Sequence, residues 1–164
     1  MLDQEIASIM TFLIEASGNP YPYYYNIPEK FLTPAIFFPQ PEISSRGATL
    51  NTYALEFSWF VKFFDKDTQS AHALAFAALT ALQVNSNVVP LIEPDGTKLR
   101  RSFRLADPSL RVADDGAVQL TLTWDSARPY AQDDLVYVRE FHANVWLKSA
   151  FTNAVGQKRG PKYG

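Results

Sequence analysis

The chain opens with apolar residues at helical spacing. One face of the first segment carries Leu2, Ile6, Ile9, Met10 and Leu13. The opposite face carries most of the polar side chains, namely Gln4, Glu5, Ser8, Thr11 and Glu15. Gly18 and Asn19-Pro20 are typical stop signals. The pattern predicts an amphipathic N-terminal helix that ends before Pro20.

A clear alternation of apolar and polar residues follows between Tyr53 and Phe63. Its odd positions are all apolar, and its even positions include Glu56, Ser58 and Lys62, so the period of two predicts a long strand with one face towards the core. Ala35–Phe38, bounded by two prolines, predicts a short strand near a sheet edge. The segment that contains Ser44–Gly47 is expected to be a polar loop.

The second half of the chain predicts one more helix and several strands. Asp65–Thr68 offers an N-cap before an apolar stripe that runs to Leu82 and is rich in alanine, which favours close packing on the sheet. Turn signals at 94–96 and 114–116 precede the strands expected at Lys98–Arg104 and Val118–Trp124, which we interpret as a meander on the same sheet. Residues 135–147 alternate less cleanly and predict a further strand.

The order of these elements predicts an α+β fold: a mainly antiparallel sheet with two helices packed on one face. We expect one domain over residues 1–152 and a basic C-terminal arm over residues 153–164. The predicted core comprises Leu55, Phe57, Trp59, Val61, Leu74, Leu79, Leu82, Leu120 and Leu122. The other face of the long strand is semi-polar, with Leu50 and Phe60 among polar residues, and is expected to be covered by a neighbouring molecule.

The composition favours contact with other proteins. Aromatic residues make up 14% of the chain, more than a core of this size ordinarily needs. The net charge of −2 provides no global field towards nucleic acid or an anionic membrane. The acidic N-terminus and the lack of a long apolar run predict a soluble chain with no leader and no membrane contact.

Candidate catalytic residues are sparse. The two histidines, His72 and His142, have no His, Glu or Asp at metal-ligand spacing, and no phosphate-binding or nucleophile motif occurs. The absence of cysteine excludes thiolate chemistry. Acidic pairs occur in turn contexts, where Asp caps helices or makes Asx turns, at Asp65/Asp67, Asp114/Asp115 and Asp133/Asp134. We therefore expect no enzyme activity, no catalytic or metal site and no cofactor.

A proline-rich segment at residues 20–28 is the first candidate interface. It holds four closely spaced tyrosines, Tyr21, Tyr23, Tyr24 and Tyr25. Its prolines forbid a regular helix, so we expect an ordered, extended loop. Packing against its own helix and docking to a partner are equally compatible with the tyrosines.

Two basic segments are the other candidates. The first, at 98–111, comprises Lys98, Arg100, Arg101, Arg104 and Arg111. A solvated strand face explains it most simply, a subunit interface comes second and phosphate contact third, because only Phe103 is interleaved for base stacking. The second is the C-terminal arm, where Lys158 and Arg159 are expected to dock on a neighbouring subunit or partner.

Over residues 2–130 the succession of elements resembles the tail terminator proteins of long-tailed bacteriophages. The resemblance rests on the amphipathic first helix, the Pro34–Phe38 strand, the aromatic strand ending in Phe63–Asp67, the alanine-leucine helix to Leu82, and the hairpin turns at Asp95-Gly96 and Asp115-Gly116. It carries no catalytic signature. Residues 133–164 are longer than the usual family end.

The resemblance implies a homo-hexameric ring in the virion, in the tail or neck, assembled in the host cytoplasm. Such a ring caps the tail tube protein, stops tube polymerisation and joins the head-tail connector protein, while DNA passes through it without sequence-specific binding. Two alternatives remain open at this point. One is another phage connector, such as a head-tail joining or tail-tube protein, and the other is a small-ligand pocket protein or enzyme.

Overall fold

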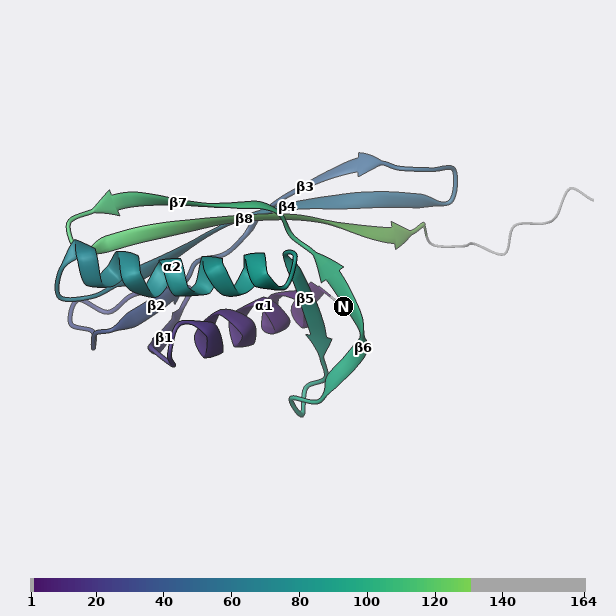
Figure 1. Cartoon of the computed structure of the whole chain (residues 1–164). Coiled ribbons are helices and arrows are strands. Elements are labelled where there is room, and N and C mark those ends of the chain that lie inside the picture. Colours follow the sequence, from purple (N-terminus) through teal and green to yellow (C-terminus); the bar gives the residue numbers. More distant parts are fainter. Residues whose placement is uncertain (1, 131–164) are drawn as a thin grey trace, which may run out of the picture. The chain divides into compact units, whose positions relative to one another are not determined.

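Two helices lie on one face of a twisted, mainly antiparallel sheet (Figure 1). The computed structural model describes residues 2–130, and within them the α+β fold is confirmed. The elements in chain order are α1 (Leu2–Ala16), β1 (Tyr21–Tyr24), β2 (Ala35–Phe38), β3 (Glu42–Gly47), β4 (Thr52–Phe64), α2 (Thr68–Val84), β5 (Val88–Ile92), β6 (Lys98–Arg104), β7 (Ala106–Asp114) and β8 (Ala117–Pro129). The strand predicted at 135–147, the domain end at residue 152 and the arm at 153–164 lie outside the described residues.

Strands β4 and β8 form the centre of the sheet. They pair over thirteen positions each, from Thr52 opposite Pro129 to Phe64 opposite Ala117. Phe57 lies opposite Trp124 and their rings stack with centroids 4.7 Å apart. The odd face of β4 is therefore the core face, as its period of two predicted.

Helix α2 packs on this face through its alanines. The Asp67 carboxylate caps the helix by accepting a hydrogen bond from the Ser70 N–H at 2.7 Å. Ala71, Ala75 and Ala78 are fully buried, and the absence of longer side chains lets the helix lie close to β8 and β7. Both the predicted cap and the predicted close packing are confirmed.

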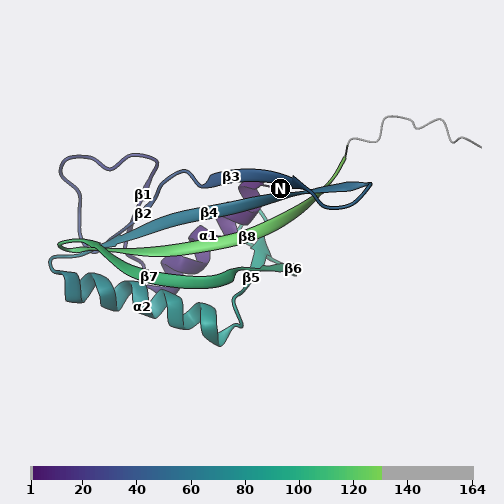
Figure 2. The ribbon, with the colours of Figure 1, turned by 90° about the horizontal axis from the view of Figure 1, so that it is seen from above.

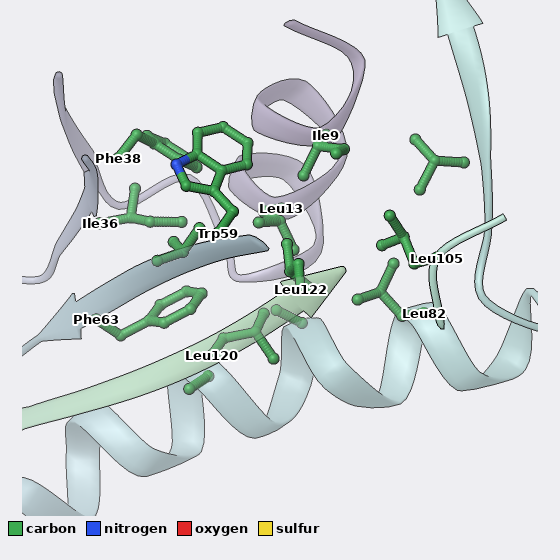
Figure 3. Packing of buried hydrophobic residues seen from close by; sticks show 14 of the residues in the cluster. Ile9, Leu13, Ile36, Phe38, Trp59, Phe63, Leu82, Leu105, Leu120 and Leu122 are labelled. Carbon is green, nitrogen blue, oxygen red and sulfur yellow. The ribbon is translucent and has the colours of Figure 1, made fainter. Parts of the chain in front are cut away.

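The predicted core residues are confirmed as members of one cluster. Phe57, Trp59, Val61, Leu82, Leu120 and Leu122 are buried, whereas Leu55, Leu74 and Leu79 pack against them at the margin. Figure 3 shows Ile9 and Leu13 of α1 beside Trp59 and Leu122, and Leu105 beside Leu82. The first helix thus closes the core from the side that α2 leaves open.

Glu5 and Ser8, which the sequence pattern assigns to the polar face of the first helix, are buried. The Ser8 hydroxyl donates to the Gln4 carbonyl at 2.6 Å and accepts from the Ile92 N–H at 3.0 Å. Glu5 faces β8, where it also has partners. Strands that follow much later in the chain satisfy these polar groups, so the helix buries a wider face than its apolar residues indicate.

Two segments expected to be loops are strands. The tyrosine segment is β1, an edge strand parallel to β2, in which the N–H groups of Tyr21 and Tyr25 donate to Pro34 and Phe38 at 2.9 and 3.0 Å. Pro22 is tolerated because N–H groups alternate along a strand, which places its nitrogen on the outer side. The expected polar loop is β3, which pairs with β4 while all six of its residues stay exposed.

The expected single meander was also wrong. Strands β5 and β6 form a separate two-stranded sheet, and β7, which was not predicted, pairs with β8 at the other edge of the main sheet (Figures 1 and 2). Side chains of α1 hydrogen-bond to the backbone of β5. The Gln4 side chain donates to the Ile92 carbonyl at 3.0 Å, and the Ser8 hydroxyl accepts from the Ile92 N–H. Ile92 of β5 therefore hydrogen-bonds to side chains of helix α1, whereas a single meander would pair this segment with the main sheet.

Candidate assembly surfaces

The four tyrosines of β1 and the residue after it form a surface that we call the aromatic edge. Tyr21, Tyr24 and Tyr25 are 51%, 45% and 60% exposed. Tyr24 also stacks on Phe38 with ring centroids 5.8 Å apart, and the Tyr23 hydroxyl accepts a hydrogen bond from the Leu32 N–H at 3.0 Å. Tyr23 and Tyr24 thus make contacts within the chain, and Tyr21, Tyr24 and Tyr25 present aromatic surface to solvent.

Strands β5 and β6 form the basic hairpin, which carries Lys98, Arg100, Arg101 and Arg104. All four side chains are exposed. Phe103 alternates with Lys98, Arg100 and Arg104 and packs on the core opposite Val89, which fixes the orientation of the strand. Within residues 2–130, no carboxylate lies in salt-bridge distance of these four cations. Arg111, by contrast, lies on β7 and donates to the Gln119 side chain at 3.2 Å.

A shallow groove of about 580 Å³ opens beside the basic hairpin; we call it the hairpin groove. Its walls come from the start of α1, from the hairpin and from the end of β8. They comprise Gln4, Glu5, Leu91, Leu99, Arg100, Arg101, Ser102, Phe103, Asp125, Ser126 and Ala127. The groove therefore combines apolar side chains with two arginines.

Both carboxylates in the groove wall already have partners. Glu5 accepts hydrogen bonds from the Trp124 indole N–H at 3.1 Å and from the Ser126 hydroxyl at 2.8 Å, and Arg128 lies 4.0 Å from it. Asp125 pairs with Arg46 at 3.0 Å. The sequence analysis missed Glu5 as a structural residue; its spacing of four from Ile9 on the helix was the available signal.

An acidic cluster lies where β4 runs into α2 and β7 turns into β8. We call it the acidic end; it comprises Asp65, Asp67, Asp114 and Asp115. Thr68 ties the two turns together, since its hydroxyl donates to Asp115 at 3.0 Å and accepts from the Gly116 N–H at 2.9 Å. The Ser70 backbone N–H lowers the pKa of the Asp67 carboxyl below its ordinary value. The turn and capping roles predicted for these residues are confirmed for Asp67.

The face of the sheet away from the helices carries a polar network. Arg46 of β3 reaches Glu56 of β4 at 2.6 Å and Asp125 of β8 at 3.0 Å. These groups are exposed, so each pair contributes little stability, but together they hold the three strands in register. The β3–β4 hairpin continues past the helices and ends in a turn where Leu50 is 98% exposed (Figure 1).

The structure does not bring the predicted interface residues together. Helix α1 begins beside β5, where Gln4 bonds to Ile92, and its last turn leads into β1, so the basic hairpin and the aromatic edge lie at opposite ends of the helix. Lys158 and Arg159 lie outside the described residues, as does His142. His72 is exposed on α2 beside Phe76, with ring centroids 6.2 Å apart.

Residues 2–130 contain neither a metal-ligand cluster nor a membrane-spanning helix. No group of three or more His, Asp or Glu side chains in this part of the chain is arranged to hold a metal ion. Neither helix described by the structure has the length and apolar character that a membrane span requires.

Comparison with known proteins identifies a relative similar enough in sequence to place this chain in a family. No protein-family model matches this chain. A chain from the solved virion of a native gene transfer agent particle aligns with 79% of this chain and 97% of its own length, at 13% identity and a TM-score of 0.43, which does not establish a common fold. The uncharacterized protein YqbJ of Bacillus subtilis (strain 168) is 30% identical over 136 residues, covering 81% of this chain and 90% of YqbJ. The chain therefore belongs to the same family as YqbJ.

Proposed function

We propose that this chain is a structural protein of a phage virion that forms a homo-oligomeric ring, caps the tail tube and joins it to the head connector. It acts by shape and surface contact, with no catalytic step. The order of helices and strands that resembles tail terminator proteins is present in residues 2–130, with β1, β3 and β7 added to it. DNA passes through the ring without sequence-specific contacts.

The observation that carries this proposal is the β3–β4 hairpin with its exposed tip. The turn is ordered, because the Thr49 hydroxyl accepts hydrogen bonds from the N–H groups of Asn51 and Thr52 at 3.2 and 3.0 Å. It presents Leu50 to solvent at 98% exposure. A large apolar side chain held outward on a fixed turn loses little conformational entropy on docking, which favours a contact with a neighbouring subunit or tube.

The open edges of the sheet also suit assembly. Strand β1 leaves one edge unpaired and β7 leaves the other among the described strands. Such edges offer backbone groups to a neighbouring chain unless something covers them. In a closed ring each subunit contacts one neighbour through one edge and the other neighbour through the opposite edge, so both edges of every subunit are covered.

Electron microscopy of the purified full-length protein, alone and after addition to isolated phage tail tubes, tests the proposal. We expect closed rings and a single ring at one end of each tube. A stack of identical rings made by this protein alone would identify a tube subunit instead. Particles with no ring, and tube ends that stay bare, would contradict the proposed function.

A further inference from the structure

Opposite charges gather at opposite ends of helix α2. The acidic end surrounds the first turn of the helix, and the last turn leads through Asn87 to the basic hairpin (Figure 1). The helix has 17 residues, so the two charged surfaces are separated by roughly 25 Å at about 1.5 Å per residue. This distance exceeds the Debye length of about 8 Å at physiological ionic strength. One copy therefore cannot neutralise its own two ends.

The arginines of the basic hairpin are positioned for an external partner. Arg100 and Arg101 line the hairpin groove and have no carboxylate partner within residues 2–130. The one anionic side chain with a lowered pKa in this hairpin, Asp95, is held by the N–H of Thr97 at 2.8 Å. Asp95 is thus engaged within its own turn, whereas the guanidinium groups of Arg100 and Arg101 have no hydrogen-bond or ion-pair partner among the described residues.

We propose that the acidic end of one copy docks in the hairpin groove of the next copy, with Arg100 and Arg101 bound to Asp114 and Asp115 of its neighbour. The inference rests on the proposed ring and identifies its repeating contact. The contact is heterologous, since the two surfaces differ, and such contacts close into a ring when the rotation between copies closes. Arginine forks bind carboxylates in bidentate geometry, which also fixes the orientation of the subunits.

The proposed contact places a backbone turn of one copy in a groove of the next. Asp114, Asp115 and Gly116 form the narrow β7–β8 turn, with Gly116 at a φ of +71°. A groove of about 580 Å³ holds a turn of this kind, and its apolar walls at Leu91, Leu99 and Phe103 contact the backbone beside the carboxylates. Glu5 and Asp125 in the wall are held by Trp124, Ser126 and Arg46, so among the described residues Arg100 and Arg101 are the charges beside the groove without a partner.

Charge reversal with mixing tests the contact. The full-length double variants Arg100→Glu/Arg101→Glu and Asp114→Lys/Asp115→Lys are studied by sedimentation velocity, separately and mixed in equal amounts. We expect each variant alone to associate at least about tenfold more weakly than the wild type. The mixture should regain rings, because alternating copies place glutamates against lysines and wild-type arginines against wild-type aspartates.

Loss of fold is separated from loss of contact by two controls. Thermal unfolding of each variant shows whether it folds. The single variant Asp114→Lys leaves the hydrogen bond between Thr68 and Asp115 intact. Recovery of rings in the mixture shows in addition that both variants are folded. A mixture that stays dissociated although both variants fold would overturn the proposed pairing.

The remaining outcomes separate this inference from the proposed function. If both reversed variants form rings like the wild type, the ring stands and the pairing of these ends is overturned. If the wild type forms no ring, the proposed function and the pairing fail together. If the arginine variant assembles normally but loses affinity for a non-specific DNA duplex, the basic hairpin is a phosphate surface and the inference is wrong.

Discussion

The indole nitrogen of Trp124 donates a hydrogen bond to the Glu5 carboxylate at 3.1 Å, which joins the first helix to the last strand of the described fold. The same carboxylate accepts from Ser126 at 2.8 Å. These bonds hold the start of α1 against the end of β8 and so form one wall of the hairpin groove. The geometry of that groove therefore depends on a buried anion far away in the sequence.

Replacement of Glu5 by alanine is expected to destabilise the protein by about 1–3 kcal/mol, because the Trp124 N–H and the Ser126 hydroxyl lose their acceptor in a buried site. Glu5→Gln keeps one acceptor oxygen and should cost less. Chemical denaturation measures both, and Glu15→Ala, at an exposed position of the same helix, is the matched control. Equal effects at Glu5 and Glu15 would contradict the role of the buried bonds.

Truncation of Trp59 tests the facing of β4. Its side chain is fully buried and its indole N–H donates to the Pro39 carbonyl at 2.6 Å, so Trp59→Ala should cost about 3–5 kcal/mol of unfolding free energy. Phe57→Ala is expected to fall in the same range. Phe60→Ala, on the opposite face of the strand, should cost clearly less. Losses below about 1 kcal/mol at both Trp59 and Phe57 would mean that the core lies elsewhere.

The cap of α2 predicts a specific pH dependence. The Ser70 hydrogen bonds lower the folded-state pKa of Asp67, so its stabilisation is fully present above the unfolded value of about 3.9 and is lost as the pH falls through the folded pKa. Asp67→Asn keeps a capping acceptor but cannot titrate. The thermal midpoint of the wild type should therefore fall more steeply in acid than that of Asp67→Asn. Parallel acid profiles of the two proteins would exclude this contribution.

The hairpin tip predicts a change in assembly without a change in folding. Leu50 is 98% exposed, so Leu50→Asp should leave the thermal midpoint unchanged and weaken association of the full-length protein. Val84→Asp, at a 78% exposed position at the end of α2, is the control for added charge. Sedimentation velocity compares the three proteins. Association of Leu50→Asp equal to that of the wild type would remove the tip from the interface.

The sequence was sufficient where an element carries its own period. Phe57 to Val61 alternate along β4, and the alanine stripe of α2 begins at a capping aspartate, so both elements were predicted with their buried faces. The local sequence pattern was insufficient where an element forms because it hydrogen-bonds to a distant segment. Strand β3 buries no side chain and exists because it pairs with β4, while β5 bonds to α1, which leaves no trace in the local pattern.

The sequence predicts which residues form the candidate surfaces but not where these surfaces lie in the fold. The exposure of Arg100 follows from the alternation around Phe103, but that of Arg101, two residues from Phe103, does not. The position of both beside a groove depends on α1 and β8, which come from the two ends of the described chain. The acidic end was predicted as turns. Its two turns lie together because Phe64 pairs with Ala117 where β4 ends and β8 begins, and the Thr68 hydroxyl adds a contact between residues 47 positions apart.

The mass of the full-length protein in solution shows whether the chain assembles as proposed. Sedimentation velocity over a series of concentrations, with electron microscopy of the main fraction, measures whether the 18.5 kDa chain closes into a ring. We expect one assembled species of fixed copy number, seen as rings, that dissociates as salt rises because charged contacts join the subunits. A monomer at every concentration would contradict it.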